Sequence, residues 1–431
     1  MAQLRPSDPE VLATAVVDSV VVVSDPDARR SGLFYWEMAR PWTEAVVAAV
    51  KKAENAEIRT LGERLAEDPA TPDHYHRLRT ALLDQAELPS TAPLFDAAWE
   101  AECNSRIGFH LGGRHTRDAE PVSVEELRAL PPGPALPPGA DPEVLIVVPF
   151  RDRDTGGARL RNLLACLLAL RDQSFPRDRY QVTVVESDDS PRWREAITPF
   201  ADHYLFAPKA GMFNKSWAVN AGVVNTPGRN EVLCILDADV LADRDFVARN
   251  AERFRSPGVG GHMTYRKMSC LDGPTTAWAI RERLRRGSAE AGADGLRAFQ
   301  LRRPPGCCLW VRTGTFHRIG GMDERYEGWG GEDNDFVYRF DVAAPFFNHD
   351  DWMLHMQHPP ASLLRDDGEL VNAHIPPLSW RPEGPIGQLD RFATEASEAS
   401  EATEASVESA ASAELAAETS TKASAEPASG S

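Results

Sequence analysis

The chain has 431 residues, 42% of them apolar and 26% charged, an ordinary globular composition with enough length for a self-sufficient core. Its formal net charge of −18 argues against a nucleic-acid-binding protein, whose binding surface would be basic. Six cysteines are scattered without a CxxC pair, which favours a reducing compartment. The N-terminus lacks a signal-peptide pattern, and the apolar stretch VLATAVVDSVVVV is too short for a bilayer. The sequence therefore predicts a cytoplasmic protein without a membrane span.

Composition divides the chain into four parts. Residues 1–130 contain long amphipathic runs and predict a mostly helical N-terminal region of unknown role. Residues 131–141, PPGPALPPGAD, predict a Pro/Gly-rich linker. A body of mixed strand and helix patterns follows over 142–391. Residues 392–431 repeat glutamate with Ala, Ser and Thr and have almost no apolar residue to bury, so we expect a disordered acidic tail.

The body alternates strand and helix patterns. Strands are predicted at 143–149, 181–187 and 231–236, and helices at 160–168 and 215–223. This alternation is typical of an open, largely parallel, Rossmann-like α/β sheet. Ligands of such sheets bind beyond the carboxyl ends of the strands. The polar motifs PFRDR, ESDD and DADV follow the three predicted strands, so we expect the site there.

The motif DADV closes the third predicted strand. Asp237 and Asp239 are one residue apart, and two carboxylates at a strand end can hold a hard divalent cation, which in turn can hold a diphosphate. The alternative is ordinary acidic capping, because such pairs commonly begin loops and helices. The position directly after an apolar strand favours the cation site.

The segment GWGGEDND at 328–335 is more specific. Its three glycines allow unusual torsions and close approach to a ligand, and Trp329 offers a flat apolar face suited to a sugar ring. Glu332, Asp333 and Asp335 open a predicted helix, where negative charge is tolerated. A turn with acidic capping is the alternative, but it does not explain a tryptophan between glycines.

Two histidines follow in LHMQHPP. His355 and His358 are spaced so that one imidazole can reach a shared site, and such ligands suit Mn²⁺ or similar ions. A purely structural role is equally compatible with the sequence. The sequence shows no cluster of Lys or Arg beside the DADV strand. We therefore expect a divalent cation, Mn²⁺ or Mg²⁺, to neutralise a diphosphate there.

Four motifs in this order resemble the β-1,4-galactosyltransferase group and its bacterial relatives, which share the GT-A fold with family-two glycosyltransferases. They are PFRDR (149–153), FNKSWAVNAG (213–222), LDADV (236–240) and GGMDERYEGWGGEDNDF (320–336). The resemblance covers roughly residues 143–360. It implies a GT-A, nucleotide-diphospho-sugar transferase fold for the body.

The resemblance also implies roles for single residues. The implied nucleotide-pocket and donor residues are Pro149, Phe150, Arg151, Arg153, Phe213, Asn214, Lys215, Asp237 and Trp329. Asp239 would bind the metal, with His355 or His358 in place of the missing Met-x-x-His pair. Glu332 and Asp333 would face the acceptor, with Asp333 as the general base.

The implied function is metal-dependent, inverting transfer of a sugar, of galactose or N-acetylhexosamine type, from a UDP-sugar to an unknown saccharide, peptide or small-molecule acceptor. Asp333 stands where retaining polypeptide N-acetylgalactosaminyltransferases typically have Asn, which favours inversion. Asn334 replaces a frequent acidic residue, and no membrane anchor is present. The alternatives are a retaining enzyme, a nucleotidyl- or phosphotransferase, which the lack of a GxxxxGK[ST] loop weakens, and a non-catalytic sugar-binding protein. Acceptor choice is expected to depend on residues 266–305 and on the N-terminal region.

Overall fold

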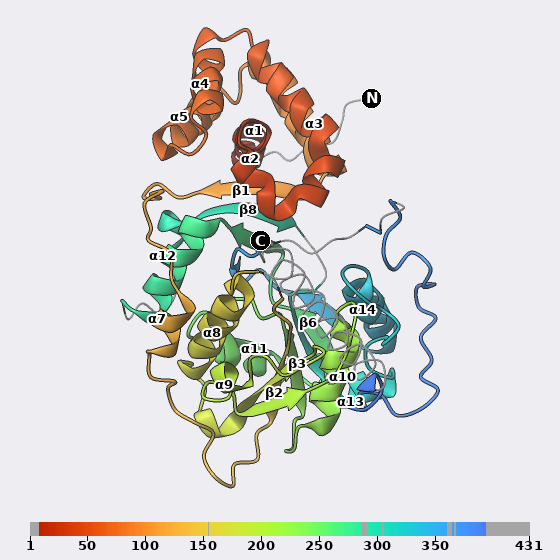
Figure 1. Ribbon diagram of the computed structural model, residues 1–431. Coiled ribbons are helices and arrows are strands. Elements are labelled where there is room, and N and C mark those ends of the chain that lie inside the picture. The colour runs from red at the N-terminus through yellow and green to blue at the C-terminus, as the bar shows by residue number, and fades with distance from the viewer. Residues whose placement is uncertain are drawn as a thin grey trace, which may run out of the picture.

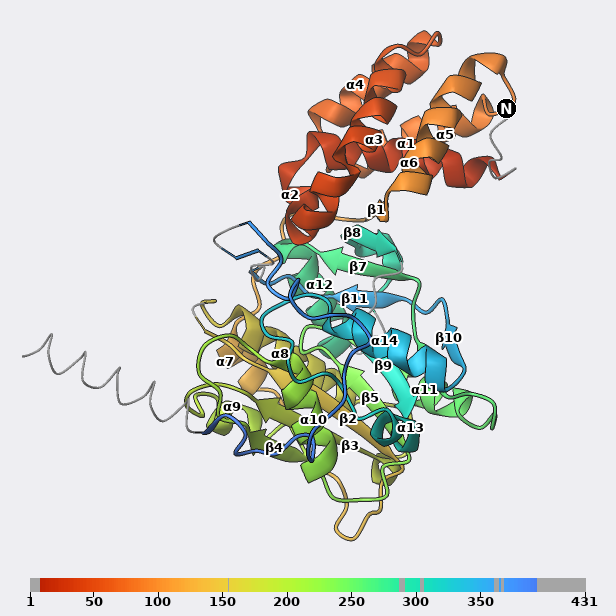
Figure 2. The ribbon, with the colours of Figure 1, turned by 90° about the vertical axis from the view of Figure 1, so that its right-hand side faces the viewer.

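The computed structural model describes residues 8–153, 155–286, 291–302, 306–359, 364–365 and 368–393. A helical N-terminal unit sits on a mixed α/β body (Figures 1 and 2). The predicted acidic tail lies, from residue 394 on, outside the described residues, as do parts of the 266–305 segment. None of the helices in the described ranges is both long and apolar enough to cross a membrane.

The helical unit confirms the prediction for the N-terminal region. Its elements are α1 (Pro9–Ser24), α2 (Pro26–Arg29), the 3₁₀ turn η1 (Arg30–Gly32), α3 (Leu33–Lys51), α4 (Ala56–Glu67), α5 (Pro72–Asp84), η2 (Pro89–Thr91) and α6 (Ala92–Asn104). The Asp8 side chain caps α1 by accepting a hydrogen bond from the backbone N–H of Glu10. The apolar stretch noted in the sequence is α1, which contacts α3, α5 and α6 and is therefore buried on most sides.

The body contains a seven-stranded sheet in the order β10-β6-β9-β5-β2-β3-β4. The strands are β2 (Val144–Phe150), β3 (Tyr180–Glu186), β4 (His203–Phe206), β5 (Val232–Leu236), β6 (Gly261–Met263), β9 (Cys308–Arg312) and β10 (Phe346–Asn348). The four strands β5, β2, β3 and β4 are parallel neighbours; β2, β3 and β5 were predicted, whereas β4 was not. The antiparallel strand β9 between β5 and β6 was not predicted. Its apolar run is short, and such a run does not indicate whether a strand is parallel or antiparallel to its neighbours.

Helices cover both faces of this sheet, as expected of an open α/β fold. They are α8 (Ala158–Arg171), α9 (Arg194–Ile197), α10 (Lys215–Asn225), α11 (Phe246–Arg253), α13 (Thr313–Arg318) and α14 (Glu332–Ala343). Helix α8 lies on one side of the sheet, and α10, α13 and α14 lie on the other (Figure 1). Helix α8, which follows β2, and α10, which precedes β5, thus cover opposite faces of the sheet (Figure 1). In open α/β sheets of this kind, ligands bind at the carboxyl ends of the strands.

A second sheet of four strands, in the order β1-β8-β7-β11, joins the helical unit to the body. Its strands are β1 (Ile107–Leu111), β7 (Lys267–Leu271), β8 (Arg297–Arg302) and β11 (Met353–His355). Two helices and two 3₁₀ turns complete the described elements: α7 (Val124–Arg128), α12 (Gly273–Leu284), η3 (Arg177–Arg179) and η4 (Ala293–Gly295). Strand β1 comes from the N-terminal region but pairs with β8 of the body. The two regions that the sequence divides at residue 130 therefore share one sheet.

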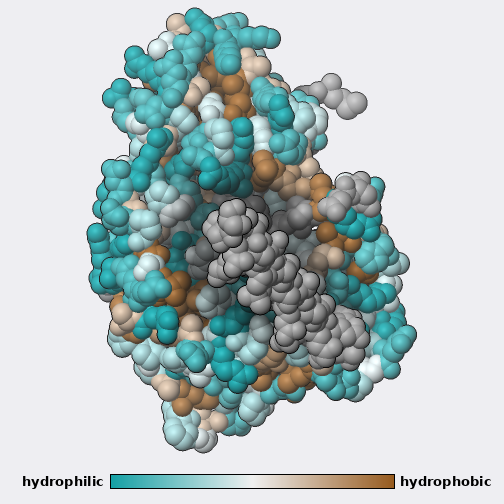
Figure 3. Space-filling model, in the orientation of Figure 1, coloured by the Kyte–Doolittle hydropathy of each residue, from teal (hydrophilic) through white to brown (hydrophobic). Residues whose placement is uncertain are grey.

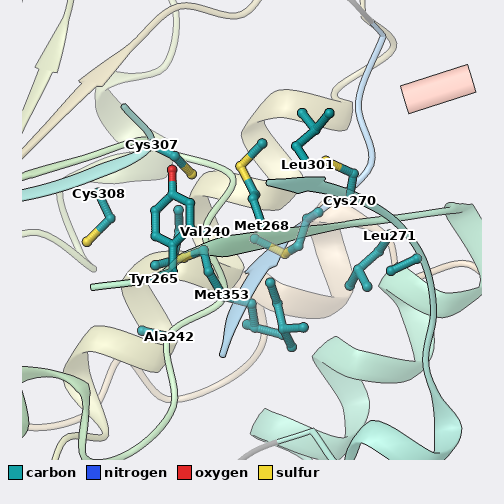
Figure 4. Packing of buried hydrophobic residues seen from close by; sticks show 14 of the residues in the cluster. Val240, Ala242, Tyr265, Met268, Cys270, Leu271, Leu301, Cys307, Cys308 and Met353 are labelled. Atoms are coloured by element: carbon teal, nitrogen blue, oxygen red, sulfur yellow. The ribbon is translucent and has the colours of Figure 1, made fainter. Parts of the chain in front are cut away.

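The core continues from the seven-stranded sheet to the second sheet. Met268 of β7 and Leu301 of β8 belong to the same buried cluster as Val240 and Met353 (Figure 4). At the other end of the chain, Phe392 packs edge-on against Trp217 of α10, with ring centroids 4.9 Å apart. The packed part of the body thus includes Phe392.

Candidate active site

Three segments meet at the carboxyl end of β5. The turn Asp237–Asp239 follows β5 directly, and its backbone bonds join it to both neighbours. The N–H of Asp237 donates to the carbonyl of Cys307 (2.9 Å), and the N–H of Met356 donates to the carbonyl of Asp239 (2.8 Å). Strand β11 ends at His355, and α14 begins at Glu332. These bonds hold the acidic turn between the histidine segment and the segment that leads into β9.

Asp239 lies between both predicted histidines. Its carboxylate oxygens are 3.3 Å from His355 Nε2 and 2.9 Å from His358 Nε2, and the three ligand atoms lie within 4.8 Å of one another. The side chains of Asp239, His355 and His358 are 14%, 20% and 15% exposed, so a cation bound there would be reachable from solvent. The fold thus brings both histidines to the carboxylate, where the sequence left the choice open.

The chemistry of this trio fits a divalent cation. Oδ1 of Asp239 is buried and accepts no hydrogen bond from any described residue, which is costly unless an ion satisfies it. Although burial opposes its charge, the two histidines hold the pKa of Asp239 below its usual range. Burial lowers the pKa of His355, which favours the neutral imidazole that metals bind. One carboxylate with two imidazoles suits Mn²⁺ and similar ions.

Cys307 is a neighbour that the sequence did not reveal. Its thiol, with Asp237 and Asp239, forms a second group of ligand atoms within 4.8 Å. The residue has a positive φ of 62°, which is strained for a side chain with a Cβ. Burial raises the pKa of the Cys307 thiol well above its ordinary value, and Asp237 and Asp239 add to this. The neutral thiol is a poor ligand, so the histidine group is the better cation site.

Asp237 has a different partner. Nζ of Lys215, at the first position of α10, is 2.9 Å from Asp237 Oδ1, 2.9 Å from Asp333 Oδ2 and 3.8 Å from Glu332 Oε1. Burial opposes the lysine's charge, but the three carboxylates raise its pKa well above the usual value. The sequence showed no basic cluster beside DADV; the fold supplies a single buried lysine from another segment.

The two acidic residues of GGED differ in their surroundings. Oδ1 of Asp333 is buried and lacks a hydrogen-bond partner within the described ranges, while Oδ2 is held by Lys215. Glu332 is buried, and burial together with the charge of Asp333 raises its pKa to about 7. Gly306 lies so close to Asp333 that a Cβ there would collide with the carboxylate, and its φ of 105° also requires glycine.

Arg151 and Arg153 lie next to the parallel strands but are not free cations. The Arg151 guanidinium donates to the carbonyls of Ser187, Lys209 and Gly211 at 2.6 to 2.7 Å. Arg153 pairs with the buried carboxylate of Asp188. Arg151 therefore holds together the loops that contain these carbonyls. Asp188 was noted in the sequence only as part of ESDD, and its burial and arginine partner mark it as a residue of this wall.

Several other predicted donor residues are explained by the fold. Pro149 and Phe150 are buried in β2, so only their backbone can face a nucleotide. The fully buried Asn214 caps α10, accepting from the N–H of Trp217 (2.8 Å), and donates to the carbonyl of Glu324. Phe213 is half-buried, and Arg151 lies over its ring with 5.6 Å to the centroid.

Trp329 remains open to the solvent. Its side chain is 40% exposed, between glycines with positive φ of 69° and 102°. Hydrogen bonds hold the backbone of this loop in place: Asn372 donates to the carbonyls of Glu327 and Gly330 at 2.9 and 2.8 Å. A large apolar ring presented by a fixed loop beside the carboxylates is a surface for a flat ligand.

Two family models match the chain. Residues 145–318 match glycosyl transferase family 2, and residues 298–344 match the model described as the N-terminal domain of galactosyltransferase. Together they span the parallel strands, the DADV turn, Gly306 and the GGED motif. No curated protein matches the chain.

Several solved structures are similar to the chain. A Drosophila β-1,4-galactosyltransferase 7 complex with manganese, UDP-Gal and xylobiose is 17% identical, with 48% of this chain and 64% of that chain covered and a TM-score of 0.29. A second Drosophila complex, with xylobiose, is 15% identical, with coverage of 58% and 80% and a TM-score of 0.30. S. aureus TarS with UDP is 14% identical, with coverage of 50% and 60% and a TM-score of 0.35.

This chain thus spans less than two thirds of the first Drosophila structure. Identities and TM-scores this low assign no substrate to it. The family models and the open sheet with its acidic motifs at the strand ends carry the assignment. The body of the chain thus carries a glycosyltransferase domain of the GT-A type, matched by the family-two model over residues 145–318 and by the galactosyltransferase model over 298–344.

Proposed function

We propose that this protein transfers a sugar from a UDP-sugar to an acceptor hydroxyl, in a single metal-dependent step that inverts the anomeric centre. One observation carries the proposal: the buried Lys215 joins the carboxylate pair of Glu332 and Asp333 to Asp237, which lies two residues before the candidate cation site at Asp239. A glycosyltransferase needs both parts, one for the leaving group and one for the nucleophile.

The first part serves the leaving diphosphate. A divalent cation held by Asp239, His355 and His358 would neutralise the charge that develops on the diphosphate as the bond to the sugar breaks. The arginines are poor substitutes, because Arg151 is bonded to three carbonyls and Arg153 to Asp188. Mn²⁺ is the ion we expect, since imidazole ligands are softer than the oxygen ligands that Mg²⁺ prefers.

The second part serves the acceptor. Asp333 has one oxygen fixed by Lys215 and one without a partner among the described residues, so Oδ1 is available to take the proton of an acceptor hydroxyl. Glu332, with a pKa of about 7, can hold a proton at neutral pH and donate a hydrogen bond to the same substrate. As the oxygen attacks the anomeric carbon, the bond to the diphosphate breaks and the proton passes to Asp333.

The donor class is tested first with a panel of nucleotide sugars, UDP-Gal, UDP-GlcNAc, UDP-GalNAc and UDP-Glc, each with Mn²⁺, with Mg²⁺ and with excess chelator. We expect one UDP-sugar to raise the melting temperature and to be hydrolysed slowly, only when metal is present. Proton NMR of the transfer product should show the inverted anomer.

Other outcomes would contradict the proposal. Retention of the anomeric configuration points to the retaining class, and release of pyrophosphate without a sugar points to a nucleotidyltransferase. Binding without turnover of any sugar points to a sugar-binding protein. Full activity of enzyme shown by elemental analysis to be metal-free would move the leaving-group role to Lys215.

A further inference from the structure

Tyr265 places a polar group in the core. Hydrophilic residues predominate on the coloured part of the face in Figure 3, where polar groups stay hydrated. Tyr265, between β6 and β7, is instead fully buried. Its hydroxyl donates to the backbone carbonyl of Gly306 (2.7 Å), and in Figure 4 it points towards Cys307. The phenol thus gives its hydrogen bond to one carbonyl, 41 residues further along the chain.

That carbonyl belongs to a tight turn. The carbonyl of Gly306 also accepts a hydrogen bond from the N–H of Cys308 (2.6 Å), two residues further on. Cys307, the residue between them, has a φ of 62°. A γ-turn whose central residue has a positive φ is rare and strained. Strained backbone persists only where the surrounding structure holds it, and the hydrogen bond from the buried Tyr265 is one such contact.

The γ-turn contacts both of the aspartates that share Lys215. The carbonyl of Cys307 accepts a hydrogen bond from the backbone N–H of Asp237 (2.9 Å). Gly306 lies against the carboxylate of Asp333, where a Cβ would collide with it. A displacement of the γ-turn would therefore alter the surroundings of both acids.

The candidate base depends on this contact. Lys215 and Gly306 both contact Oδ2 of Asp333, whereas Oδ1 is buried and has no hydrogen-bond partner among the described residues. The direction of Oδ1 therefore follows from how Oδ2 is held. A displacement of about 1 Å in a reacting group can cost about 10²-fold in rate.

The candidate cation site is held by other bonds. The carbonyl of Asp239 accepts from the N–H of Met356 (2.8 Å), and Val240 forms a β-bridge with His355. These bonds join the residues after Asp237 to the end of β11 rather than to the γ-turn. A displacement of the γ-turn should thus affect the candidate base more than the binding of metal.

We propose that Tyr265 is a positioning residue for sugar transfer: its hydroxyl holds the γ-turn, and the γ-turn holds Asp333 with Oδ1 directed at the hydroxyl that it deprotonates. The inference rests on the proposed function, because Asp333 is the base of that reaction. Tyr265 acts through the backbone of Gly306 and not through the substrate. Its loss should therefore lower the rate of the chemical step and leave donor binding in place.

The chain offers a matched control for this role. Tyr180 is also buried, and its hydroxyl donates to the backbone carbonyl of Leu170 (2.6 Å). It stands at the first position of β3, at the amino end of the strand, whereas the candidate site lies at the carboxyl end of β5. Tyr180→Phe thus removes an equivalent hydrogen bond away from the site.

The test measures hydrolysis of UDP-Gal, UDP-GlcNAc, UDP-GalNAc and UDP-Glc by the full-length protein with Mn²⁺, so that water replaces the acceptor hydroxyl. Tyr265→Phe should lower kcat for the hydrolysed donor about 10–100-fold, while its KM and the Mn²⁺ dependence stay within about twofold. Tyr180→Phe should keep kcat within about twofold. Each variant loses one hydroxyl, so the melting temperature should fall by no more than about 5 °C in either.

A double-mutant cycle tests whether the effect passes through the γ-turn. Gly306→Ala places a Cβ against Asp333 and should lower kcat at least as much as Tyr265→Phe. If Tyr265 acts through Gly306, adding Tyr265→Phe to Gly306→Ala should lower kcat by less than about threefold more. Losses that multiply would mean that Tyr265 acts elsewhere, and the proposal would be overturned.

Hydrogen exchange gives a readout that needs neither turnover nor a folded Gly306 variant. The N–H groups of Asp237 and Cys308 donate to the γ-turn, so they should exchange about tenfold faster in Tyr265→Phe than in Tyr180→Phe. Unchanged exchange, wild-type kcat in Tyr265→Phe, or a rise in KM at constant kcat would overturn the inference. If the wild type hydrolyses no UDP-sugar, the proposed function fails and the role in transfer with it, whereas faster exchange would still show that Tyr265 holds the γ-turn.

Discussion

The candidate site has two halves, one around Asp239 and one around Lys215, and they compensate the charge of their buried carboxylates in different ways. Asp239 is next to His355 and His358, the proposed metal ligands, whereas Asp333 and Asp237 share the ammonium of Lys215. In the first half, Oδ1 of Asp239 has no hydrogen-bond partner among the described residues, and a cation from solution can compensate it. In the second half, the compensating cation is the side chain of Lys215.

This difference has a physical consequence. A buried charge must be compensated, and a compensating ion taken from solution makes the first half depend on metal concentration. A lysine with a strongly raised pKa stays charged over the whole working range, so the second half does not depend on solution conditions in this way. Metal titration and mutation of the lysine should therefore separate the two halves.

The largest effect is expected at the candidate base. Asp333→Asn keeps the shape of the side chain but removes its ability to take a proton, so transfer should fall about 10²–10⁴-fold. Stabilisation by UDP-sugar with Mn²⁺ should be retained, because the cation site is intact. Asp341→Asn on the exposed face of α14 is the control. Near wild-type transfer by the Asp333 variant would show that the base is another group.

A smaller loss of activity should distinguish the role of the metal ion from that of Lys215. His358→Ala should lower activity about 10–100-fold at low Mn²⁺, and raising the Mn²⁺ concentration should restore much of it, because the loss is one of metal affinity. Lys215→Met should lower activity by a similar factor at every Mn²⁺ concentration, since it leaves Asp237 and Asp333 buried without a partner.

The measurement is the initial rate of donor hydrolysis as a function of Mn²⁺ for each variant. Lys51→Met, at an exposed lysine at the end of α3, controls for the substitution itself. Rescue of the Lys215 variant by Mn²⁺ would mean that the lysine and the metal neutralise the same charge, and the division into two halves would then be wrong.

The parts of the fold predicted correctly are those with a local signal. Strands β2 and β5 are continuous apolar runs, β3 is rich in valine, and a polar motif follows each of them; α8 and α10 have helical patterns. The second sheet gave no such signal. Strand β11 has only three residues, and β1 is an edge strand that depends on β8 for its hydrogen bonds.

The site divides in the same way. The pair Asp237 and Asp239 and the pair Glu332 and Asp333 are each recognisable, because each pair lies within one short motif. The lysine bridge between two motifs and the buried oxygens without a hydrogen-bond partner depend on segments that are distant in sequence. The sequence therefore indicated which residues carry the chemistry but not how their charges are balanced.

The last prediction concerns stability rather than rate. Burial and Asp333 raise the pKa of Glu332 to about 7 in the folded protein, against an ordinary value near 4.3 in the unfolded chain. The folded state thus binds a proton that the unfolded state releases between these values. The stabilisation is complete below about pH 4 and is lost as the pH rises through 7.

Glu332→Gln removes this titration, so wild type should lose about 2 kcal/mol of unfolding free energy relative to the variant between pH 5 and pH 8. Denaturant unfolding of both proteins across this range measures the difference, and Asp341→Asn should run parallel to wild type. A difference between wild type and the Glu332 variant that stays constant with pH would show that Glu332 is ionised throughout, and that its partners compensate its charge as fully as the histidines can compensate Asp239.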